Sequence, residues 1–293
     1  MIQAPDVNDM RKVVIAALDE DLRYGPDVTT TACVPQDAVA EADVVHRQAG
    51  VLAGIPAALI VLDEVLGEGA YDVLSCRSDG EYLNAGEVAM RLRAPARGLL
   101  VAERVALNLL RHLSGIATVT RSWVEAVEGT GAIIRDTRKT LPGLRKLQKY
   151  AVLCGGGQNH RFGLGDAAQI KDNHVIAAGS ITAAMAAVRA AAPGVHCVVE
   201  VDSLEEMNQA LEAGAIHLIL DNFTPEQCEV AVRHRNAAGY QQVKFEVSGE
   251  LRFEQARAFA EAGVDYLAAG TLTHSSPALD LSLDLKVSSS FQA

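Results

Sequence analysis

The stretch CVVEVDSLEEMNQALEAGAIHLILDN, residues 197–222, decides the fold class of this chain. Its first apolar run ends in acidic residues and leads into Ser203. Glu206 follows three residues later, which is the pattern of a capping box at a helix start. We expect this helix to end at Gly214, because glycine commonly follows a helix C-terminus. A second apolar run closes the stretch, so the sequence predicts one βα unit followed by the next strand.

The same pattern repeats on both sides of this stretch. Successive apolar runs end at Lys171, Glu200, Asp221, Ser248 and Gly270, which are 29, 21, 27 and 22 residues apart. The runs are almost continuously apolar, as in a parallel sheet that is covered on both faces. We therefore predict an α/β fold with a βα barrel, in which these positions lie at the C-terminal strand ends where barrels bind ligands. An open doubly wound sheet would produce a similar pattern, so the pattern does not decide whether the barrel is closed or incomplete.

The first part of the chain has a different pattern. The expected helices cover residues 10–22, 56–66 and 99–113, and the expected strands cover residues 43–47, 72–76 and 88–93. These elements predict an N-terminal α+β sandwich-like domain over residues 1–113. The βα-barrel catalytic domain then covers residues 114–274, and the last segment, 275–293, is expected to pack back onto the first domain.

Composition excludes several classes of function. The chain has 293 residues, of which 49% are hydrophobic, and a net charge of −11. An acidic protein of this kind is a poor partner for nucleic acid or an anionic membrane. Residues 1–10 contain no basic residue and carry Asp6 and Asp9, so we expect no signal peptide. The five cysteines form no CxxC pair, and the histidines at 46, 112, 196, 217 and 234 have no ligand spacing. We expect reduced thiols, no structural metal site and a cytoplasmic location.

One window reverses the overall charge. Residues 135–174 contain eight basic and three acidic residues, a net charge of +5, which leaves −16 for the remainder. Like charges gathered in this way repel one another unless an anion lies among them. The window also contains Gly155-Gly156-Gly157, where the backbone can approach a ligand closely. We therefore predict a binding site for small anions.

Individual basic residues in this window allow more than one interpretation. Arg138 and Lys139 follow an expected strand and can bind a carboxylate or a phosphate, although a solvated loop is the simpler alternative. Arg145, Lys146 and Lys149 are spaced as on a helix and are expected to form an exposed face, while Lys171 could be a Schiff-base nucleophile. Its neighbours of mixed charge favour a simple cationic contact instead.

Acidic residues end the neighbouring strands. Glu200 and Asp221 can hold ribose hydroxyls, a magnesium ion or a developing cation. Asp202 is explained by its place at a helix N-terminus, where an acid is favoured. Ser248-Gly249 and Gly270 end the last strands, a position at which backbone amides of barrels bind phosphate.

Together these strings resemble the quinolinate phosphoribosyltransferase family. The matching stretches are Asp27-Val28-Thr29-Thr30 and residues 19–22, 102–118, 136–143, 149–161, 170–174, 200–202, 220–222, 248–249 and 272–274. The resemblance covers nearly the whole chain. It implies a nicotinate-nucleotide diphosphorylase (carboxylating), a pentosyltransferase of NAD biosynthesis. This enzyme converts quinolinate and phosphoribosyl pyrophosphate (PRPP) into nicotinate mononucleotide, pyrophosphate and carbon dioxide, with Mg²⁺ as cofactor.

The resemblance also implies a role for each matching residue. The quinolinate carboxylates would be held by Arg138, His160, Arg161 and Lys171, with Arg104 supplied by the other subunit of a homodimer. Pyrophosphate would be neutralised by Lys139 and Lys171. Ribose hydroxyls and PRPP-bound Mg²⁺ would be held by Glu200 and Asp221, which would also stabilise an oxocarbenium-like transition state. The 5′-phosphate would lie against Ser248, Gly249 and Gly270, with His274 nearby. Lys139, Lys171, Glu200 and Asp221 are thus the expected catalytic residues.

Three alternatives to this function stay open. One is a paralogous phosphoribosyltransferase for another anionic ring, such as the molybdenum-locus relatives. The others are a non-catalytic anion-binding barrel and a Schiff-base aldolase that uses Lys171. The chain departs from the family at Glu250, where a small or neutral residue is usual. We expect Glu250 to cap the following helix, because a carboxylate that faces bound phosphate would be unfavourable.

Overall fold

The computed structural model describes residues 2–286 and divides the chain into two compact units. Unit 2 consists of Ser122–Lys139 and Gly157–Leu272, and unit 1 contains the remaining residues. The N-terminal unit is therefore larger than the segment 1–113 that the sequence suggested, because residues 114–121 and 140–156 also belong to it. The last seven residues of the expected returning segment, 287–293, lie outside the described part.

Unit 1 is built on an antiparallel sheet. Its elements are α1 (Val7–Leu22), α2 (Val28–Cys33), β1 (Val39–His46), β2 (Gly50–Val51), α3 (Ile55–Leu66), β3 (Asp72–Cys76), β4 (Tyr82–Leu83), β5 (Val88–Pro95), most of α4 (Ala96–Ala126), α5 (Arg145–Cys154) and β12 (Leu281–Lys286). The four-stranded sheet has the order β12-β1-β5-β3. β12 therefore brings the C-terminal segment back to the first sheet, where it pairs with β1.

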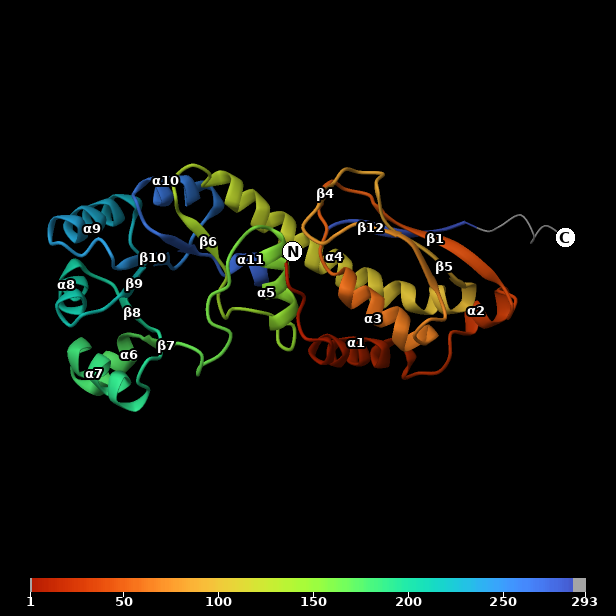
Figure 1. Cartoon of the computed structure of the whole chain (residues 1–293), viewed down its shortest axis with the longest axis horizontal. Helices are drawn as coiled ribbons and strands as arrows, with labels where there is room; N and C mark the ends of the chain where they lie inside the picture. Colours follow the sequence, from red (N-terminus) through yellow and green to blue (C-terminus); the bar gives the residue numbers. More distant parts are fainter. Residues whose placement is uncertain (1, 287–293) are drawn as a thin grey trace. The chain divides into compact units, whose positions relative to one another are not determined.

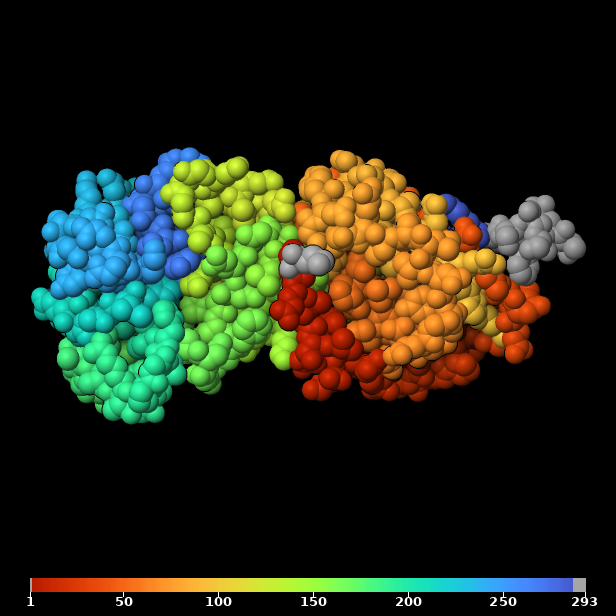
Figure 2. Space-filling model, viewed as in Figure 1, coloured from red at the N-terminus to blue at the C-terminus, as the bar shows by residue number. Residues whose placement is uncertain are grey.

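Apolar side chains hold the helices of unit 1 against this sheet. Met90 and Leu92 of β5, Leu62 of α3 and Leu99 and Leu110 of α4 surround one small internal space and are almost fully buried. Burial of this kind is the main stabilising contribution to a fold. On the outside of α3, helix α1 packs at the surface of the unit (Figures 1 and 2).

Helix α4 continues well beyond the segment 99–113 that the sequence predicted. Gly115 comes two residues after the expected end and lies within the helix. In the structure, a β-carbon at this position would lie 2.0 Å from the carbonyl oxygen of Pro277. The glycine therefore serves a close approach of two chain segments and does not end the helix.

Unit 2 is the predicted α/β unit with a parallel sheet. Its elements are β6 (Ile133–Arg135), β7 (Ala168–Ile170), α6 (Asp172–Ala178), α7 (Ile181–Ala191), β8 (Cys197–Val201), α8 (Leu204–Glu212), β9 (His217–Asp221), α9 (Pro225–Ala237), β10 (Lys244–Ser248), a 3₁₀ turn η1 (Phe253–Gln255), α10 (Ala256–Glu261) and β11 (Tyr266–Ala268). A short helix, α11 (Thr271–His274), lies at the boundary of the units.

The six strands of unit 2 have the order β6-β11-β10-β9-β8-β7 and are all parallel. β6 and β7 are the two edge strands, and in the described part of the chain no ladder joins them. The barrel is therefore not closed by hydrogen bonds. Helices α6–α10 lie outside the strands in Figure 1. Because all six strands are parallel, their carboxyl ends gather at one edge of the sheet.

The helix starts of unit 2 follow their sequence signals. The Ser203 hydroxyl accepts a hydrogen bond from the Glu206 amide at 3.3 Å, and the Thr224 and Gln227 side chains form the reciprocal capping box of α9.

No single helix in residues 2–286 is both long and apolar enough to cross a membrane, although α6 and α7, bent by 89°, pass that test as a pair.

Candidate active site

A pocket of about 660 Å³ opens at the carboxyl ends of the strands of unit 2. It is lined by Thr137, Arg138, Lys139, His160, Arg161, Gln169, Lys171, Glu200, Ile219, Asp221, Asn222, Glu246, Ser248, Gly249, Glu250 and Ala268. Nine of the twelve predicted site residues are therefore brought together. Gly270 is not among the lining residues, and Arg104 and His274 belong to unit 1.

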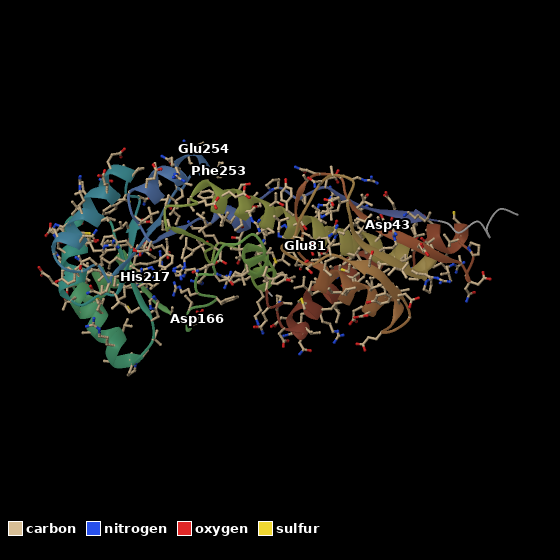
Figure 3. The ribbon with its side chains drawn as sticks, turned by 45° about the horizontal axis from the view of Figure 1, so that its top comes forward. Asp43, Glu81, Asp166, His217, Phe253 and Glu254 are labelled. Atoms are coloured by element: carbon tan, nitrogen blue, oxygen red, sulfur yellow. The ribbon has the colours of Figure 1, made fainter. Side chains whose placement is uncertain are left out.

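One wall of the pocket is basic. Burial and the nearby Arg138 cation lower the pKa of Arg161. The Nη1 atom of Arg161 donates to the carbonyl oxygen of Ala167 at 2.9 Å, while its buried Nε makes no hydrogen bond in this structure. Asp166, labelled in Figure 3, fixes the turn that carries Arg161. Its carboxylate accepts hydrogen bonds from the backbone amides of Phe162 and Gly163. Two partly desolvated guanidinium groups side by side form a strong site for an anion.

The opposite wall is acidic. Glu200 at the end of β8 accepts hydrogen bonds from the Nζ atom of Lys171 at 2.7 Å and from the Nε2 atom of Gln169 at 3.1 Å. Burial, with a contribution from the Glu200 carboxylate, raises the pKa of Asp221 at the end of β9. Two carboxylates on adjacent strands therefore repel each other across the pocket, which prepares the site for a positive charge.

A tight backbone contact shapes the end of the pocket beside β10. Gly249 has a φ of +126°, and a β-carbon there would lie 2.4 Å from the Oδ1 atom of Asn222. Asn222 itself has a positive φ of 56°, and its amide donates to the carbonyl oxygen of Ser248 at 3.0 Å. The loops after β9 and β10 are thus held together, and only glycine fits at position 249.

The prediction that Glu250 caps a helix is wrong. The next turn begins at Phe253 with no side-chain cap, and α10 begins at Ala256, also without one. Glu250 is exposed and lines the pocket instead. The chain makes an irregular turn after Gly249, so the helix starts too far along the sequence for this carboxylate to reach it.

Two other expectations about the basic window are corrected. Lys146 is exposed and paired with Asp9, but Lys149 is fully buried, so these lysines do not share an exposed helix face. The triple glycine does not line the pocket. A β-carbon at Gly155 would lie 2.5 Å from the carbonyl oxygen of Ala117, so this glycine allows α5 to end close to α4.

Carboxylates in the pocket are suited to a metal ion that arrives with a substrate. In residues 2–286, no group of three or more histidine, cysteine, aspartate and glutamate side chains could hold a metal by itself. Glu200 and Asp221 provide two carboxylates at one edge. Mg²⁺ commonly binds one or two carboxylates together with substrate phosphates and water, so the donor set fits such an ion.

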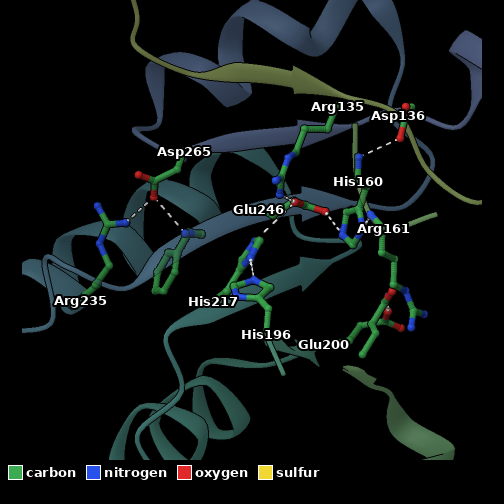
Figure 4. Close-up of polar contacts among 12 residues, drawn as sticks. Arg135, Asp136, His160, Arg161, His196, Glu200, His217, Arg235, Glu246 and Asp265 are labelled. Atoms are coloured by element: carbon green, nitrogen blue, oxygen red, sulfur yellow. Dashed lines mark hydrogen bonds and ion pairs between the residues drawn. The ribbon is translucent and has the colours of Figure 1, made fainter. Parts of the chain in front are cut away.

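The floor of the pocket was not predicted from the sequence. Glu246 on β10 is fully buried and contacts Arg135, His160 and His217 (Figure 4). One signal was available, because a glutamate in the middle of the apolar run VKFEV, residues 243–247, is unusual for a buried strand. Its partners come from other strands and could not be identified from spacing.

Comparisons with known proteins agree over both units. A family model described as the C-terminal domain of quinolinate phosphoribosyl transferase matches residues 116–284, and the model of its N-terminal domain matches residues 27–114. The nicotinate-nucleotide pyrophosphorylase [carboxylating] of Mycobacterium leprae is 54% identical, over 97% of this chain and 100% of that protein. A probable enzyme of the same name from Bacillus subtilis is 42% identical over 92% of this chain and 91% of its own. The solved nicotinate-nucleotide pyrophosphorylase from Francisella tularensis superposes with a TM-score of 0.91 at 35% identity, over 98% of this chain and 99% of that one.

Proposed function

The chain belongs to the quinolinate phosphoribosyltransferase family, and on that premise we propose that the pocket of unit 2 transfers the phosphoribosyl group of PRPP to quinolinate. The products are nicotinate mononucleotide, pyrophosphate and carbon dioxide. One observation carries the proposal: the guanidinium groups of Arg138 and Arg161 share a single pocket with the carboxylates of Glu200 and Asp221. A substrate pair that is anionic but reacts through a cationic sugar needs both signs of charge.

The basic wall binds the dianionic ring. Arg161 and Arg138 take the two carboxylates of quinolinate, and Lys171 contacts the carboxylate beside the ring nitrogen. His160 contributes to the shape of this wall, since its side chain is 10% exposed. Arg161 is partly desolvated and its buried Nε makes no hydrogen bond, so a substrate carboxylate is a favourable partner for this side chain.

The acidic wall acts on the sugar. As the bond from C1 of the ribose to pyrophosphate lengthens, positive charge develops on the ribose ring. Glu200 and Asp221 stabilise that charge and bind the ribose hydroxyls. Lys139 neutralises the departing pyrophosphate, and the 5′-phosphate lies against the backbone of Ser248 and Gly249, with Gly270 as a further contact.

Decarboxylation follows from the charge that the first step creates. The ring nitrogen attacks C1 and becomes a cationic pyridinium. The adjacent carboxylate then leaves as carbon dioxide, and its electron pair stays on the ring carbon, where the neighbouring cation stabilises it until a proton is added. No side-chain nucleophile is required for either step.

Three further features complete the proposal. Mg²⁺ bound to PRPP would neutralise the pyrophosphate, and Glu200 and Asp221 would hold it. The active enzyme is a homodimer in which the exposed Arg104 reaches the pocket of the other subunit. A cytoplasmic location is supported by the five cysteines, all of which are unpaired.

The Schiff-base alternative has less support. A lysine nucleophile needs a free amine, whereas the Nζ atom of Lys171 is held 2.7 Å from Oε2 of Glu200 in an ion pair. An anion-binding barrel without catalysis would gain nothing from Glu200 and Asp221 beside its basic wall. Neither alternative explains both walls of the pocket.

A direct assay tests the proposal. Purified protein is incubated with quinolinate, PRPP and Mg²⁺, and nicotinate mononucleotide and carbon dioxide are measured. The same reaction with nicotinate in place of quinolinate is the matched control for ring choice. We expect product from quinolinate and little from nicotinate. Conversion of nicotinate without conversion of quinolinate would overturn the proposal.

A further inference from the structure

The floor of the pocket is polar where a barrel is usually aliphatic. Barrel interiors are commonly filled by valine, isoleucine and leucine. Here the interior contains Arg135 of β6, Glu246 of β10 and His217 of β9 (Figure 4). His160, from the segment between α5 and β7, contacts Glu246. We call these four residues the buried polar cluster.

Glu246 is the centre of the cluster. Its Oε2 atom accepts a hydrogen bond from Nη1 of Arg135 at 2.9 Å and lies 3.4 Å from Nε2 of His217. Its Oε1 atom lies 3.2 Å from Nε2 of His160. Burial alone would raise the pKa of Glu246, but His160 and His217 hold that pKa well below its ordinary value. The carboxylate is therefore ionised, although its side chain is only 1% exposed.

Hydrogen bonds define where the imidazole protons lie. The amide of Arg161 donates to Nδ1 of His160 at 2.7 Å, so Nδ1 carries no proton and Nε2 must carry the one that faces Glu246. The backbone of His160 is held as well, because its amide donates to Oδ1 of Asp136 at 2.9 Å. Rotation of this ring would break its contacts with both Glu246 and Arg161.

A purely stabilising role would not explain this arrangement. A buried ion pair is often no more stable than apolar residues of the same volume, because desolvation offsets the attraction. The cluster lies directly beneath the basic wall, and His160 connects the two by accepting the amide of Arg161. A change in the cluster therefore alters the position of Arg161, the residue that faces the anion.

We propose that Glu246 is a positioning residue for the aromatic dicarboxylate substrate. It fixes the orientation and the Nε2–H tautomer of His160, and His160 in turn holds the backbone of Arg161. Without the carboxylate, the ring turns and Arg161 no longer stays at the place where it meets a substrate carboxylate. The identity of the ligand as quinolinate rests on the proposed function, whereas the tautomer does not.

Two variants test the role by their quinolinate affinity, measured by titration without turnover. In Glu246→Leu, which offers no acceptor to His160, the affinity should fall about tenfold or more, while the KM for PRPP changes less than about twofold. This single variant leaves Arg135 buried without its counter-charge and is expected to be less stable. Arg135→Met/Glu246→Leu removes both charges and should show the same loss of quinolinate affinity.

Asp265→Asn is the matched control. Asp265 forms a second ion pair in unit 2, with the Nη1 atom of Arg235 at 2.9 Å, and neither residue lines the pocket (Figure 4). This variant should lose stability but keep quinolinate affinity within about twofold, because it leaves the His160 ring in place. Equal loss of affinity in Asp265→Asn, or unchanged affinity in the double variant, would overturn the positioning role.

The tautomer gives a readout that needs no substrate. Nitrogen-15 NMR of the histidine rings should show His160 as the Nε2–H form in the wild type and as a mixture in Glu246→Leu. An Nδ1–H form in the wild type would overturn the inference even if quinolinate is converted. If the wild type neither binds nor converts quinolinate, the proposed function fails, while the NMR result still decides the role of Glu246.

Discussion

Lys171 and Glu200 form an ion pair within the pocket, with the Nζ atom of Lys171 2.7 Å from Oε2 of Glu200. The lysine comes directly after β7 and the glutamate from β8, so the pair joins the basic wall to the acidic wall. In the proposed reaction each member has another task, the lysine with a substrate carboxylate and the glutamate with the ribose. Binding of substrates must therefore separate the pair.

The ion pair predicts that Glu200→Gln has different effects on turnover and on quinolinate binding. The value of kcat should fall about 10²-fold to 10³-fold, because one group that stabilises the transition state is lost. Quinolinate should bind as well as before or more tightly, because Lys171 no longer has a competing carboxylate. Steady-state kinetics and a quinolinate titration measure the two effects. Glu205→Gln, an exposed acid on α8, should change neither, and an unchanged kcat in Glu200→Gln would contradict the role of Glu200.

Gly249→Ala should damage both stability and PRPP binding. The new β-carbon would lie 2.4 Å from Oδ1 of Asn222, in a backbone conformation that is itself unfavourable for alanine. Strain of this kind costs about 1–3 kcal/mol, and the KM for PRPP should rise more than that for quinolinate, because the loops after β9 and β10 must move apart.

Gly239→Ala is the control for this prediction. Gly239 also has a positive φ, of 84°, but a β-carbon there meets nothing within 4 Å. Denaturant unfolding of the two variants therefore separates backbone strain from the contact with Asn222. Equal losses of stability, with an unchanged KM for PRPP in both variants, would show that the close approach at Gly249 has no part in substrate binding.

Asp221→Asn should increase stability at neutral pH while it removes activity. Burial and the neighbouring Glu200 raise the pKa of Asp221. The folded state therefore favours the protonated acid, a stabilisation that is complete below the ordinary aspartate pKa of about 3.9 and lost as the pH rises through the raised value. Above that value the charged carboxylate is a cost that asparagine does not have.

Melting temperatures measured against pH, without Mg²⁺ or substrates, test this sign. The variant should melt above the wild type at pH 7, and the difference should disappear below about pH 4. Its kcat should fall about 10²-fold or more, since a carboxylate that stabilises the sugar cation is removed. A lower melting temperature for Asp221→Asn at pH 7 would mean that the charged form is stabilised in the fold.

Most of the residues predicted for the site line one pocket, because the patterns that identified them are local. A strand that ends in a polar residue before a capped helix can be recognised from a few neighbours, and in parallel strands such ends meet at one edge. Lys171, Glu200, Asp221 and Ser248 were found in this way, and the pocket contains all four. The identity of the substrate did not follow from these rules and came from the resemblance to a family.

The features that the sequence could not predict depend on contacts between distant segments. Gly115 lies within α4 where a side chain would meet the carbonyl oxygen of Pro277. Lys149 looks like part of an exposed helix face until the packing around α5 buries it. Glu246 meets Arg135 only because β6 and β10 both flank β11. Periodicity along the chain contains no information on such pairs.

The proposed homodimer leads to a prediction about which subunit's pocket Arg104 serves. Its side chain on α4 is 56% exposed, and the nearest ion-pair contact is Glu103 at 4.0 Å. Arg104→Ala and Lys139→Ala should each be nearly inactive. If Arg104 serves the pocket of the other subunit, a hybrid dimer of the two variants contains one site with both residues intact and one with neither.

Random mixing makes half of the dimers hybrids, each with one intact site, so the mixture should recover about a quarter of wild-type activity for a symmetric dimer. Lys139→Ala mixed with Arg138→Ala is the control, because both residues line the same pocket from one chain and no hybrid site is complete. That mixture should stay inactive after unfolding and refolding together. If the Arg104→Ala and Lys139→Ala mixture also stays inactive while mixed dimers are present, Arg104 acts within its own subunit.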